Sequence, residues 1–345
     1  MTGTDLNGFQ SSGAHVVLCP QRLYAFDQPV CGFKSEGADP MEVMAQGHVP
    51  PNLVSIVILS RGKCGLSKVI TRCLLAMAVS DLVVIIIEVI LRQIIPLYFG
   101  YNFLRVSPAC NLQTVLRYAS ECSSVWLTVC FTFDRFLAIC HQKLSPKYCT
   151  EQTATVVIAT VSGLSCFISL PWYFIYELHI GTSCIYSQGY ISSPLWAAFE
   201  IFQYIFTPLL AIFLNLLLNS LTVRYILVAS RVRRRLRAHR SGETDRDPEM
   251  ENRRKSITLL FAISVSFILL WLTYFVNYTL LRIAFMTRFR IFIYSPVAQE
   301  VGIMLQLLSC STNTCIYAVT QRKFREELKN GVKYPFKLIV KLVKE

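Results

Sequence analysis

Charged residues are scarce in this sequence. They make up 16% of its 345 residues, against 53% hydrophobic residues, and the mean hydropathy is +0.46. A soluble domain carries about one charged residue in four, so the composition excludes a soluble enzyme or binding module. The chain is predicted to be a polytopic membrane protein.

Acidic residues are scarcer than basic ones, at 21 against 34, which gives a formal net charge of +13. Such an excess can indicate nucleic-acid binding. Here the basic residues lie between apolar spans, which is typical of positive-inside topology and of contact with anionic lipids. We therefore expect membrane lipids as partners and no nucleic acid.

Catalytic and metal-binding patterns are also absent. The five His residues are dispersed, no HExxH or P-loop occurs, and the 13 Cys residues form no CxxC pair. We expect neither an enzyme nor a zinc site. A transporter is an alternative because paired charges could line a substrate path, although the two halves of the chain show no internal repeat.

The first 47 residues show no periodic apolar pattern and are predicted to be a poorly defined N-terminal segment, followed by a membrane domain over residues 48–320. The apolar run after Asn52 has only seven residues, too few to cross a bilayer alone. The first helix is therefore expected to be short or truncated.

The central span runs from Cys110 to Cys140. Its part up to Arg135 forms about 37 Å of helix, more than the ~30 Å of hydrocarbon in a bilayer. Arg117, Glu121 and Ser124 follow at spacings of four and three, so they share one helix face. Because ionisable groups are costly at membrane depth, this face is predicted to point into a helix bundle.

Five further spans are predicted at about residues 70–99, 153–173, 195–226, 256–284 and 295–319. Basic residues after spans one, three and five and in the tail place those segments in the cytoplasm and the N-terminus outside. In residues 321–345, Phe324 and Leu328 lie four apart among charges, which predicts a short amphipathic helix on the membrane surface. The predicted fold class is all-α, a seven-helix transmembrane bundle.

Several motifs resemble the rhodopsin-like (class A) G-protein-coupled receptors over about residues 50–331. They are Asp81, Cys110, Cys184, the triplet Asp134-Arg135-Phe136 and the segment Asn313-Thr-Cys-Ile-Tyr317. Leu-Ala-x-x-x-Ser-Asp-Leu in span two, Trp126 and the Leu-Asn-Ser after Pro208 are most similar to the orphan receptor 139 and 142 group. The resemblance implies a plasma-membrane receptor that passes binding of an extracellular amino acid or small peptide to a heterotrimeric G protein.

The same resemblance implies a disulfide between Cys110 and Cys184 and a G-protein-coupling role for Asp134, Arg135 and Phe136. Arg is suited to that role because its fork of donors can exchange an acidic partner for the carbonyls of an incoming helix. In the alternative interpretation, the Arg135 side chain only extends to the lipid headgroups at the membrane interface and has no coupling role.

A sodium pocket and an activation switch are implied as well. The pocket oxygens would come from Asp81, Ser124, Ser309 and Asn313, and such ligands suit a hard cation. The alternative is a protonated Asp81 hydrogen-bonded to water. The switch residues would be Trp271, Asn313 and Tyr317, with plain core packing as the alternative for Trp271.

Two helices depart from the family pattern. Thr273 and Thr314 stand where the family has a helix-bending Pro, so these helices are expected to bend less or to bend through hydroxyl hydrogen bonds. The foot of the sixth helix, Asn252-Arg-Arg-Lys255, has no acidic partner for Arg135. A truncated, non-signalling receptor copy is the alternative function, and the short first helix decides between the two.

Five ionisable residues in the outer halves of the second, third and fifth spans are the candidate ligand site: Glu88, Arg92, Arg117, Glu121 and Glu200. Unpaired charges would be costly there, so we expect internal ion pairs around a wet cavity. An Arg beside carboxylates suits a zwitterion. The alternative is a salt-bridge network that binds no ligand.

Overall fold

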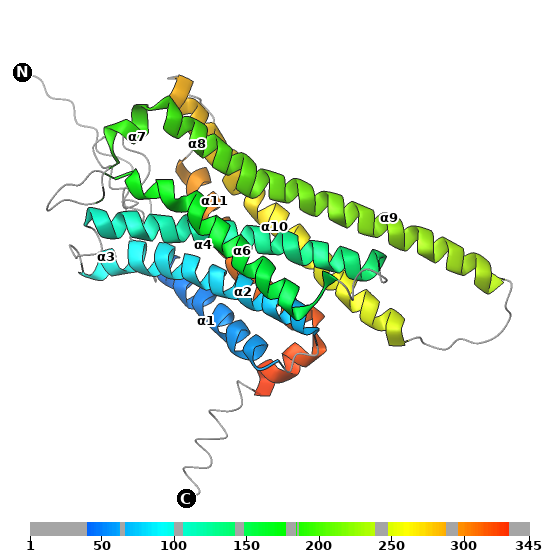
Figure 1. The fold of residues 1–345 in the computed structure, drawn as a ribbon. Coiled ribbons are helices and arrows are strands. Elements are labelled where there is room, and N and C mark those ends of the chain that lie inside the picture. The colour runs from blue at the N-terminus through cyan, green and yellow to red at the C-terminus, as the bar shows by residue number, and fades with distance from the viewer. Residues whose placement is uncertain are drawn as a thin grey trace, which may run out of the picture.

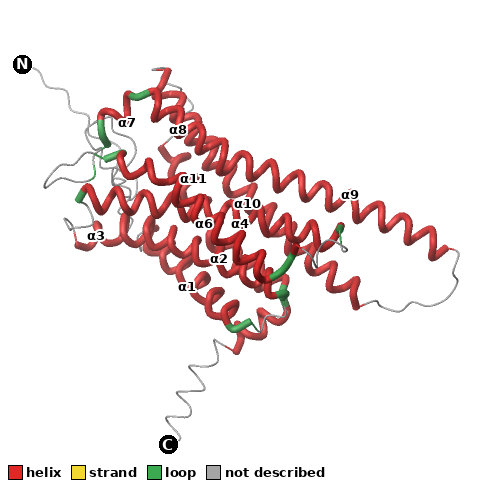
Figure 2. The backbone as a smooth tube through the Cα atoms, in the orientation of Figure 1, coloured by secondary structure: helices red, strands yellow, loops and turns green. Residues whose placement is uncertain are grey.

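The structure, a computed structural model, describes residues 40–62, 66–99, 106–141, 148–176, 184, 186–238, 248–287 and 296–330. The described residues form helices that lie side by side in one elongated bundle (Figures 1 and 2). An isolated antiparallel β-bridge joins Tyr176 to Tyr186. The predicted all-α class is confirmed, and residues 1–39 of the N-terminal segment lie outside the described residues.

The main helices are, in chain order, α1 (Pro40–Ser60), α2 (Lys68–Ile85), α4 (Ser107–Cys140), α6 (Glu151–Ser169), α8 (Pro194–Tyr204), α9 (Leu210–Ala238), α10 (Pro248–Thr287) and α11 (Pro296–Thr320). The shorter elements are the π-helix η1 (Ile86–Ile94), α3 (Ile95–Phe99), the 3₁₀-helix η3 (Leu170–Phe174), α7 (Gln188–Ser192) and the π-helix η4 (Ile205–Leu209).

Six helical stretches of the described residues are long and apolar enough to cross a membrane: Lys68–Arg92, Pro108–Cys140, Glu151–Phe174, Pro194–Ala229, Ile257–Leu280 and Val301–Thr320. The apolar part of α1, Val49–Ser60, is shorter. Six full spans and one short first helix therefore match the prediction.

Helix α1 begins earlier than the sequence pattern indicated. Residues 40–47 are already helical, so the boundary expected at residue 48 falls inside α1. A Pro in the first helical position and good helix formers such as Met41, Glu42 and Ala45 favour this start. These residues have high helix propensity but no apolar periodicity. The boundary at residue 48 was predicted from apolar periodicity alone, so it did not include them.

Hydroxyl side chains set the starts of several helices. Ser67, Thr150 and Ser193 each accept a hydrogen bond from a backbone N–H in the first turn of α2, α6 and α8. Such N-caps satisfy donors that have no partner within the helix. The chain therefore leaves one helix and enters the next at these residues.

Proline marks two irregular helix turns. Pro208 lies in η4, where the fifth span widens from α- to π-helix, and Pro171 lies in η3 at the end of the fourth span. A ring without an N–H removes one helical hydrogen bond and favours such turns. In contrast, α10 and α11 continue as regular α-helix past Thr273 and Thr314.

The helices of the fifth and sixth spans extend beyond the predicted bounds. The fifth span was predicted to end at about residue 226 and the sixth to begin at about residue 256, but α9 continues to Ala238 and α10 already begins at Pro248 (Figure 1). Charged residues such as Arg and Glu have good helix propensity outside the membrane. The change from apolar to charged residues therefore did not mark the ends of these two helices.

Helix α4 lies at the centre of the bundle. It packs against α2, α6, α9 and α10, while α11 packs against α10, α1 and α2. At one end of the bundle, residues 322–330 form the predicted amphipathic helix. Its Phe324 is fully buried against Tyr317, with ring centroids 5.8 Å apart, and its charged residues face outward.

Candidate functional site

Arg117 of α4 is the centre of a buried charge network. Its Nε atom lies 2.9 Å from a carboxylate oxygen of Glu88 in η1 and 3.0 Å from one of Glu121, one turn along α4. All three residues are at most 8% exposed. Two carboxylates thus share one guanidinium, an arrangement that stabilises charge where water is excluded.

Arg92 extends this network toward the loop between the fourth and fifth spans. It lies 3.4 Å from Glu88 and donates to the hydroxyl oxygens of Thr114, at 2.8 Å, and Tyr176, at 3.0 Å. Its carboxylate partner is already held by Arg117. Arg92 therefore contacts two neutral hydroxyl groups in addition to Glu88.

A disulfide ties this loop to α4. Cys110 and Cys184 are bonded, as the resemblance implied, with 6.1 Å between their Cα atoms. Next to the disulfide, the rings of Tyr176, Tyr186 and Tyr190 form a continuous stack. The described loop residues Tyr176, Cys184 and Tyr186 are thus held by a covalent bond to α4, by stacked rings and by the Arg92–Tyr176 hydrogen bond.

Glu200 is placed apart from the ion pairs of the other four candidate residues. It is 2% exposed in α8 and accepts a hydrogen bond from the Tyr190 hydroxyl. Burial raises the pKa of Tyr190, which keeps this phenol protonated as the donor. Sequence spacing put Glu200 in the outer half of its span and carried no information about which neighbour it would face.

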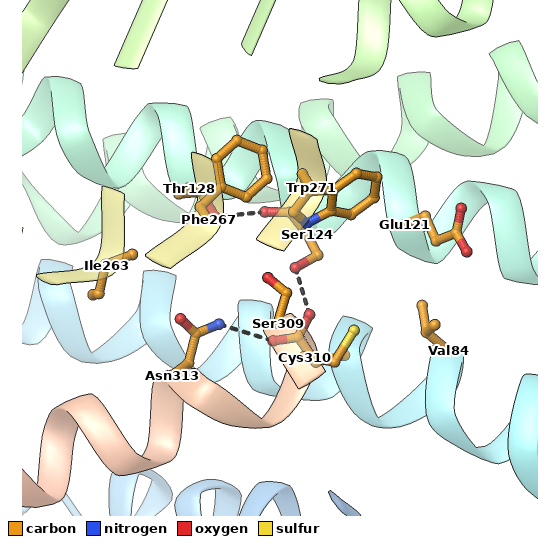
Figure 3. A pocket seen from close by; sticks show the side chains of 11 residues that line it. Val84, Glu121, Ser124, Thr128, Ile263, Phe267, Trp271, Ser309, Cys310 and Asn313 are labelled. Atoms are coloured by element: carbon orange, nitrogen blue, oxygen red, sulfur yellow. Dashed lines mark hydrogen bonds between the residues drawn. The ribbon is translucent and has the colours of Figure 1, made fainter. Parts of the chain in front are cut away.

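Asp81 of α2 lies at a small enclosed cavity in the middle of the bundle (Figure 3). Its two carboxylate oxygens accept hydrogen bonds from the Ser124 hydroxyl at 2.5 Å and from the Asn313 amide at 3.1 Å. Ser309 and Thr128 also line the cavity, whose volume of about 10 Å³ is that of one water-sized group. The four residues of the implied sodium pocket are therefore gathered at one place.

The same cavity joins the charge network to the aromatic core. Glu121 lines it from one side and Trp271 from another, as Figure 3 shows. Trp271 is 5% exposed and packs against Phe267 and Tyr274, with centroid distances of 5.7 and 5.8 Å. Of the five candidate ligand residues Glu121 alone is among the described residues that line this cavity, so it is not the wet cavity expected around all five.

The triplet Asp134-Arg135-Phe136 lies at the other end of α4. Arg135 donates to an Asp134 carboxylate oxygen from Nε, at 3.0 Å, and from a terminal nitrogen. Both residues are at most 9% exposed. Phe136 is half-buried and packs edge-on against His141. Arg135 is thus held by its sequence neighbour.

Tyr317 is 1% exposed in α11 and lies in the apolar cluster that includes Met77, Leu127 and Phe131. Its hydroxyl group makes no hydrogen bond within the described part of the chain. A buried hydroxyl without a partner is unfavourable. Asn313, one turn before it, is instead occupied by Asp81.

Sequence reasoning missed several members of the site. Thr114 and Tyr176 hold Arg92, and Gln306 lies in α11 with a fully buried amide. Thr114 precedes Arg117 by three residues and Gln306 precedes Asn313 by seven, so helical spacing places both on the faces already singled out. No spacing signal could have identified Tyr176, which reaches Arg92 from a different element.

Comparison with known families gives a match over most of the chain. The family model described as "7 transmembrane receptor (rhodopsin family)" matches residues 51–317. The match begins within α1 and ends at Tyr317, so it includes all seven helices.

The chain is also similar to receptors for neuromedin U and for thyrotropin-releasing hormone. It is 25% identical to neuromedin-U receptor 2 of Mus musculus over 273 residues, 75% of this chain and 66% of that receptor. It is 28% identical to neuromedin U receptor homolog nmur-2 of Caenorhabditis elegans over 106 residues, 31% of this chain and 26% of the relative. It is 27% identical to thyrotropin-releasing hormone receptor of Mus musculus over 143 residues, 40% and 35% of the two chains. Each alignment covers less than two thirds of the relative's length.

Proposed function

Because the chain belongs to the rhodopsin family of seven-transmembrane receptors, we propose that it converts binding of an extracellular ligand into activation of a heterotrimeric G protein. One observation carries this proposal. A single 34-residue helix, α4, holds the Arg117 charge network near one end, Ser124 beside the Asp81 cavity, and the Asp134–Arg135 pair near the other end. When ligand binding displaces α4 or its neighbours at the Arg117 end, the rigid helix can therefore transmit the movement to the Asp134–Arg135 end.

The ligand would bind at the outer charge network, beneath the disulfide-tied loop. Arg92 supports this role because an incoming carboxylate or carbonyl group can replace the Tyr176 hydroxyl without unpairing Arg117. The network offers both signs of charge, which suits a zwitterionic amino acid or a small peptide. The similarity to receptors for neuromedin U and thyrotropin-releasing hormone favours a peptide ligand.

Within the family, the sequence motifs around Asp81, Trp126 and Asn219 support a place near the orphan receptor 139 and 142 group. That group would favour an aromatic amino acid over a longer peptide. A functional screen with amino acids and short peptides on the same cells distinguishes the two ligand classes.

The Asp81 cavity fits a sodium ion. Asp81, Ser124 and Ser309 bring a carboxylate and two hydroxyl groups to one small cavity, and hard cations prefer oxygen ligands, while the Asn313 amide nitrogen donates to Asp81. A bound ion would supply a positive charge opposite Asp81, and these residues would hold it at the base of Trp271.

Arg135 carries the proposed coupling step, and substitution by Ala tests it. In cells expressing the full chain with an N-terminal tag, Arg135→Ala is expected to abolish ligand-independent G-protein activation while surface labelling stays unchanged. Phe133→Ala, an exposed position on the same turn, serves as the control and should retain activation. Undiminished activation by the Arg135→Ala chain would overturn the assigned role.

The second candidate is a non-signalling receptor copy, and the short apolar part of α1, Val49–Ser60, favours it. Surface labelling of an N-terminal tag compares the natural chain with one whose α1 is lengthened by an apolar outer half. A labelled natural chain supports a working plasma-membrane receptor with its N-terminus outside. Labelling of the lengthened chain alone supports the non-signalling copy.

A further inference from the structure

Helix α9 continues well past the membrane. The apolar stretch that starts at Pro194 is 36 residues long, whereas about 28 helical residues cross the ~40–45 Å of a bilayer with its headgroups. Counted from Pro194, the helix therefore leaves the membrane near Thr222, which contacts the thiol of Cys140 at the end of α4. Beyond this level α9 runs on to Ala238 and extends past α4 (Figure 1). Residues 223–238 are called the α9 extension.

An exposed apolar stripe runs along the α9 extension. Tyr225, Val228 and Val232 are 42%, 51% and 53% exposed, and their spacings of three and four residues place them on one helix face. Leu236 follows four residues later in the sequence. Because a row of large apolar side chains outside the membrane is unfavourable in water, it indicates an interaction surface.

The apolar stripe is not the face with which α9 packs against the bundle. Thr222 is fully buried, and Ile226 packs half-buried against the apolar cluster that includes Phe131. These two residues mark the side of α9 that is turned toward the bundle. Counting about 3.6 residues per turn places the stripe about a third of a turn away from them. A partner can therefore reach the stripe without entering the bundle.

The α9 extension is also strongly basic. Residues 223–238 contain six Arg and no Asp or Glu, and the helical count places all six Arg positions outside the apolar stripe. The side chains of Arg224 and Arg231 are exposed. A basic amphipathic helix of this kind suits either an acidic protein with an apolar groove or the surface of an anionic membrane.

The straight course of α9 favours the acidic protein. To lie on the bilayer the helix would have to turn sharply where it leaves the membrane, and sharp kinks come from Pro, Gly or a π-bulge. After Pro208 the next Pro or Gly in the sequence is Gly242, and α9 is continuous α-helix from Leu210 to Ala238. A second copy of the chain is disfavoured as well, because it would bring the six Arg of one extension against the six of the other.

We propose that the α9 extension is a docking site for an acidic, Ca²⁺-loaded EF-hand protein, whose Met-lined groove receives Tyr225, Val228 and Val232. Flexible Met side chains adapt to such apolar anchors, and acidic residues beside the groove pair with Arg224 and Arg231. Because Ca²⁺ opens the groove, binding requires Ca²⁺. The inference goes beyond the proposed function and rests on it only for the cytoplasmic position of the α9 extension.

The test measures binding of calmodulin, as the probe, to the purified full chain in nanodiscs of uncharged phosphatidylcholine. The native chain should bind with Ca²⁺ and should not bind when a chelator removes it. Val228→Gln combined with Val232→Gln should raise Kd about tenfold or more, because two apolar anchors are lost. Leu227→Gln is the control, since Leu227 is 53% exposed on another face, and it should leave Kd nearly unchanged. Gln is a good helix former, so these variants keep α9 helical.

No Ca²⁺-dependent binding, or equal losses from the double variant and from Leu227→Gln, overturns the proposal. Loss of calmodulin binding in nanodiscs that contain phosphatidylserine would show that the anionic bilayer occupies the stripe, which also overturns it. So would a dimer of the chain alone that the double variant separates, since a second copy is then the occupant.

G-protein activation by the same preparations is measured separately, so that the two proposals can fail independently. Calmodulin binding without any activation removes the proposed function and leaves the docking site on α9. Activation without calmodulin binding removes the docking site and leaves the proposed function.

Discussion

The hydroxyl oxygen of Thr314 in α11 lies 2.8 Å from that of Ser55 in α1. Thr314 also donates to the Pro51 carbonyl oxygen at 3.1 Å, so Ser55 is the donor in the first bond. Ser55 is fully buried, and α1 packs against α2 and α11. The Thr that replaces the expected Pro thus ties the short first helix into the bundle, which favours a working receptor over a defective copy.

We predict that Thr314→Val lowers the stability of the receptor by about 1 kcal/mol, because it leaves the Ser55 hydroxyl without its acceptor. Adding Ser55→Ala should cause little further loss, because both partners are then gone. The measurement is Tm of the purified chain. Thr312→Val is the control, since among the described residues the Thr312 hydroxyl donates to the Leu308 carbonyl oxygen of its own helix and to no other helix. Fully additive losses would show that the two hydroxyl groups are not coupled.

The Arg117 network gives a second prediction. Arg117→Met should destabilise the fold by about 3–5 kcal/mol, because it leaves Glu121 as an uncompensated buried charge. Adding Glu121→Gln should restore much of the loss, since that charge is then removed. Surface expression and Tm both report the effect. The control is Arg322→Met. The ion pair of Arg322 with Glu326 is largely exposed, so its loss should lower the stability by at most about 1 kcal/mol. A double variant no better than Arg117→Met would refute the charge argument.

Gly302 permits the close approach of α10 and α11. A Cβ atom at this position would lie 3.3 Å from the Cα atom of Tyr274 and 3.5 Å from the Asn277 amide. We expect Gly302→Val to lower Tm by several degrees, because backbone atoms of α10 must move. Gly163→Ala is the matched control, since nothing lies within 4 Å of its Cβ position, and it should raise stability by about 0.5–1 kcal/mol. Equal effects of the two substitutions would contradict this helix packing.

The sodium proposal predicts a cation-specific stabilisation. Tm of the purified receptor should rise with NaCl more than with choline chloride at equal ionic strength, because an ion that binds only the folded state stabilises it. Asp81→Asn should abolish the difference, since it removes the carboxylate that Ser124 and Asn313 flank. Thr128→Val, a change at the edge of the same cavity, should preserve it. Identical curves in the two salts would remove sodium from the site.

Relationships along one helix could be predicted from the sequence. Arg117, Glu121 and Ser124 share a face of α4 because side chains three and four residues apart adjoin on any helix. The structure indeed turns them toward the network and the cavity. The disulfide and the grouping of Asp81 with Ser124 and Asn313 followed from the family resemblance, which transfers contacts that spacing alone does not contain.

Relationships between helices were decided only by the tertiary structure. Glu200 is bonded to Tyr190, Arg92 to Tyr176, and Thr314 to Ser55. Each contact depends on the rotation and height of one element against another, and these are set by the packing of many apolar side chains together. The sequence by itself determined the six apolar spans, the short apolar part of the first helix and the polar face of the central helix, because these follow from local composition and periodicity. Which polar faces meet was decided by the packing of the bundle.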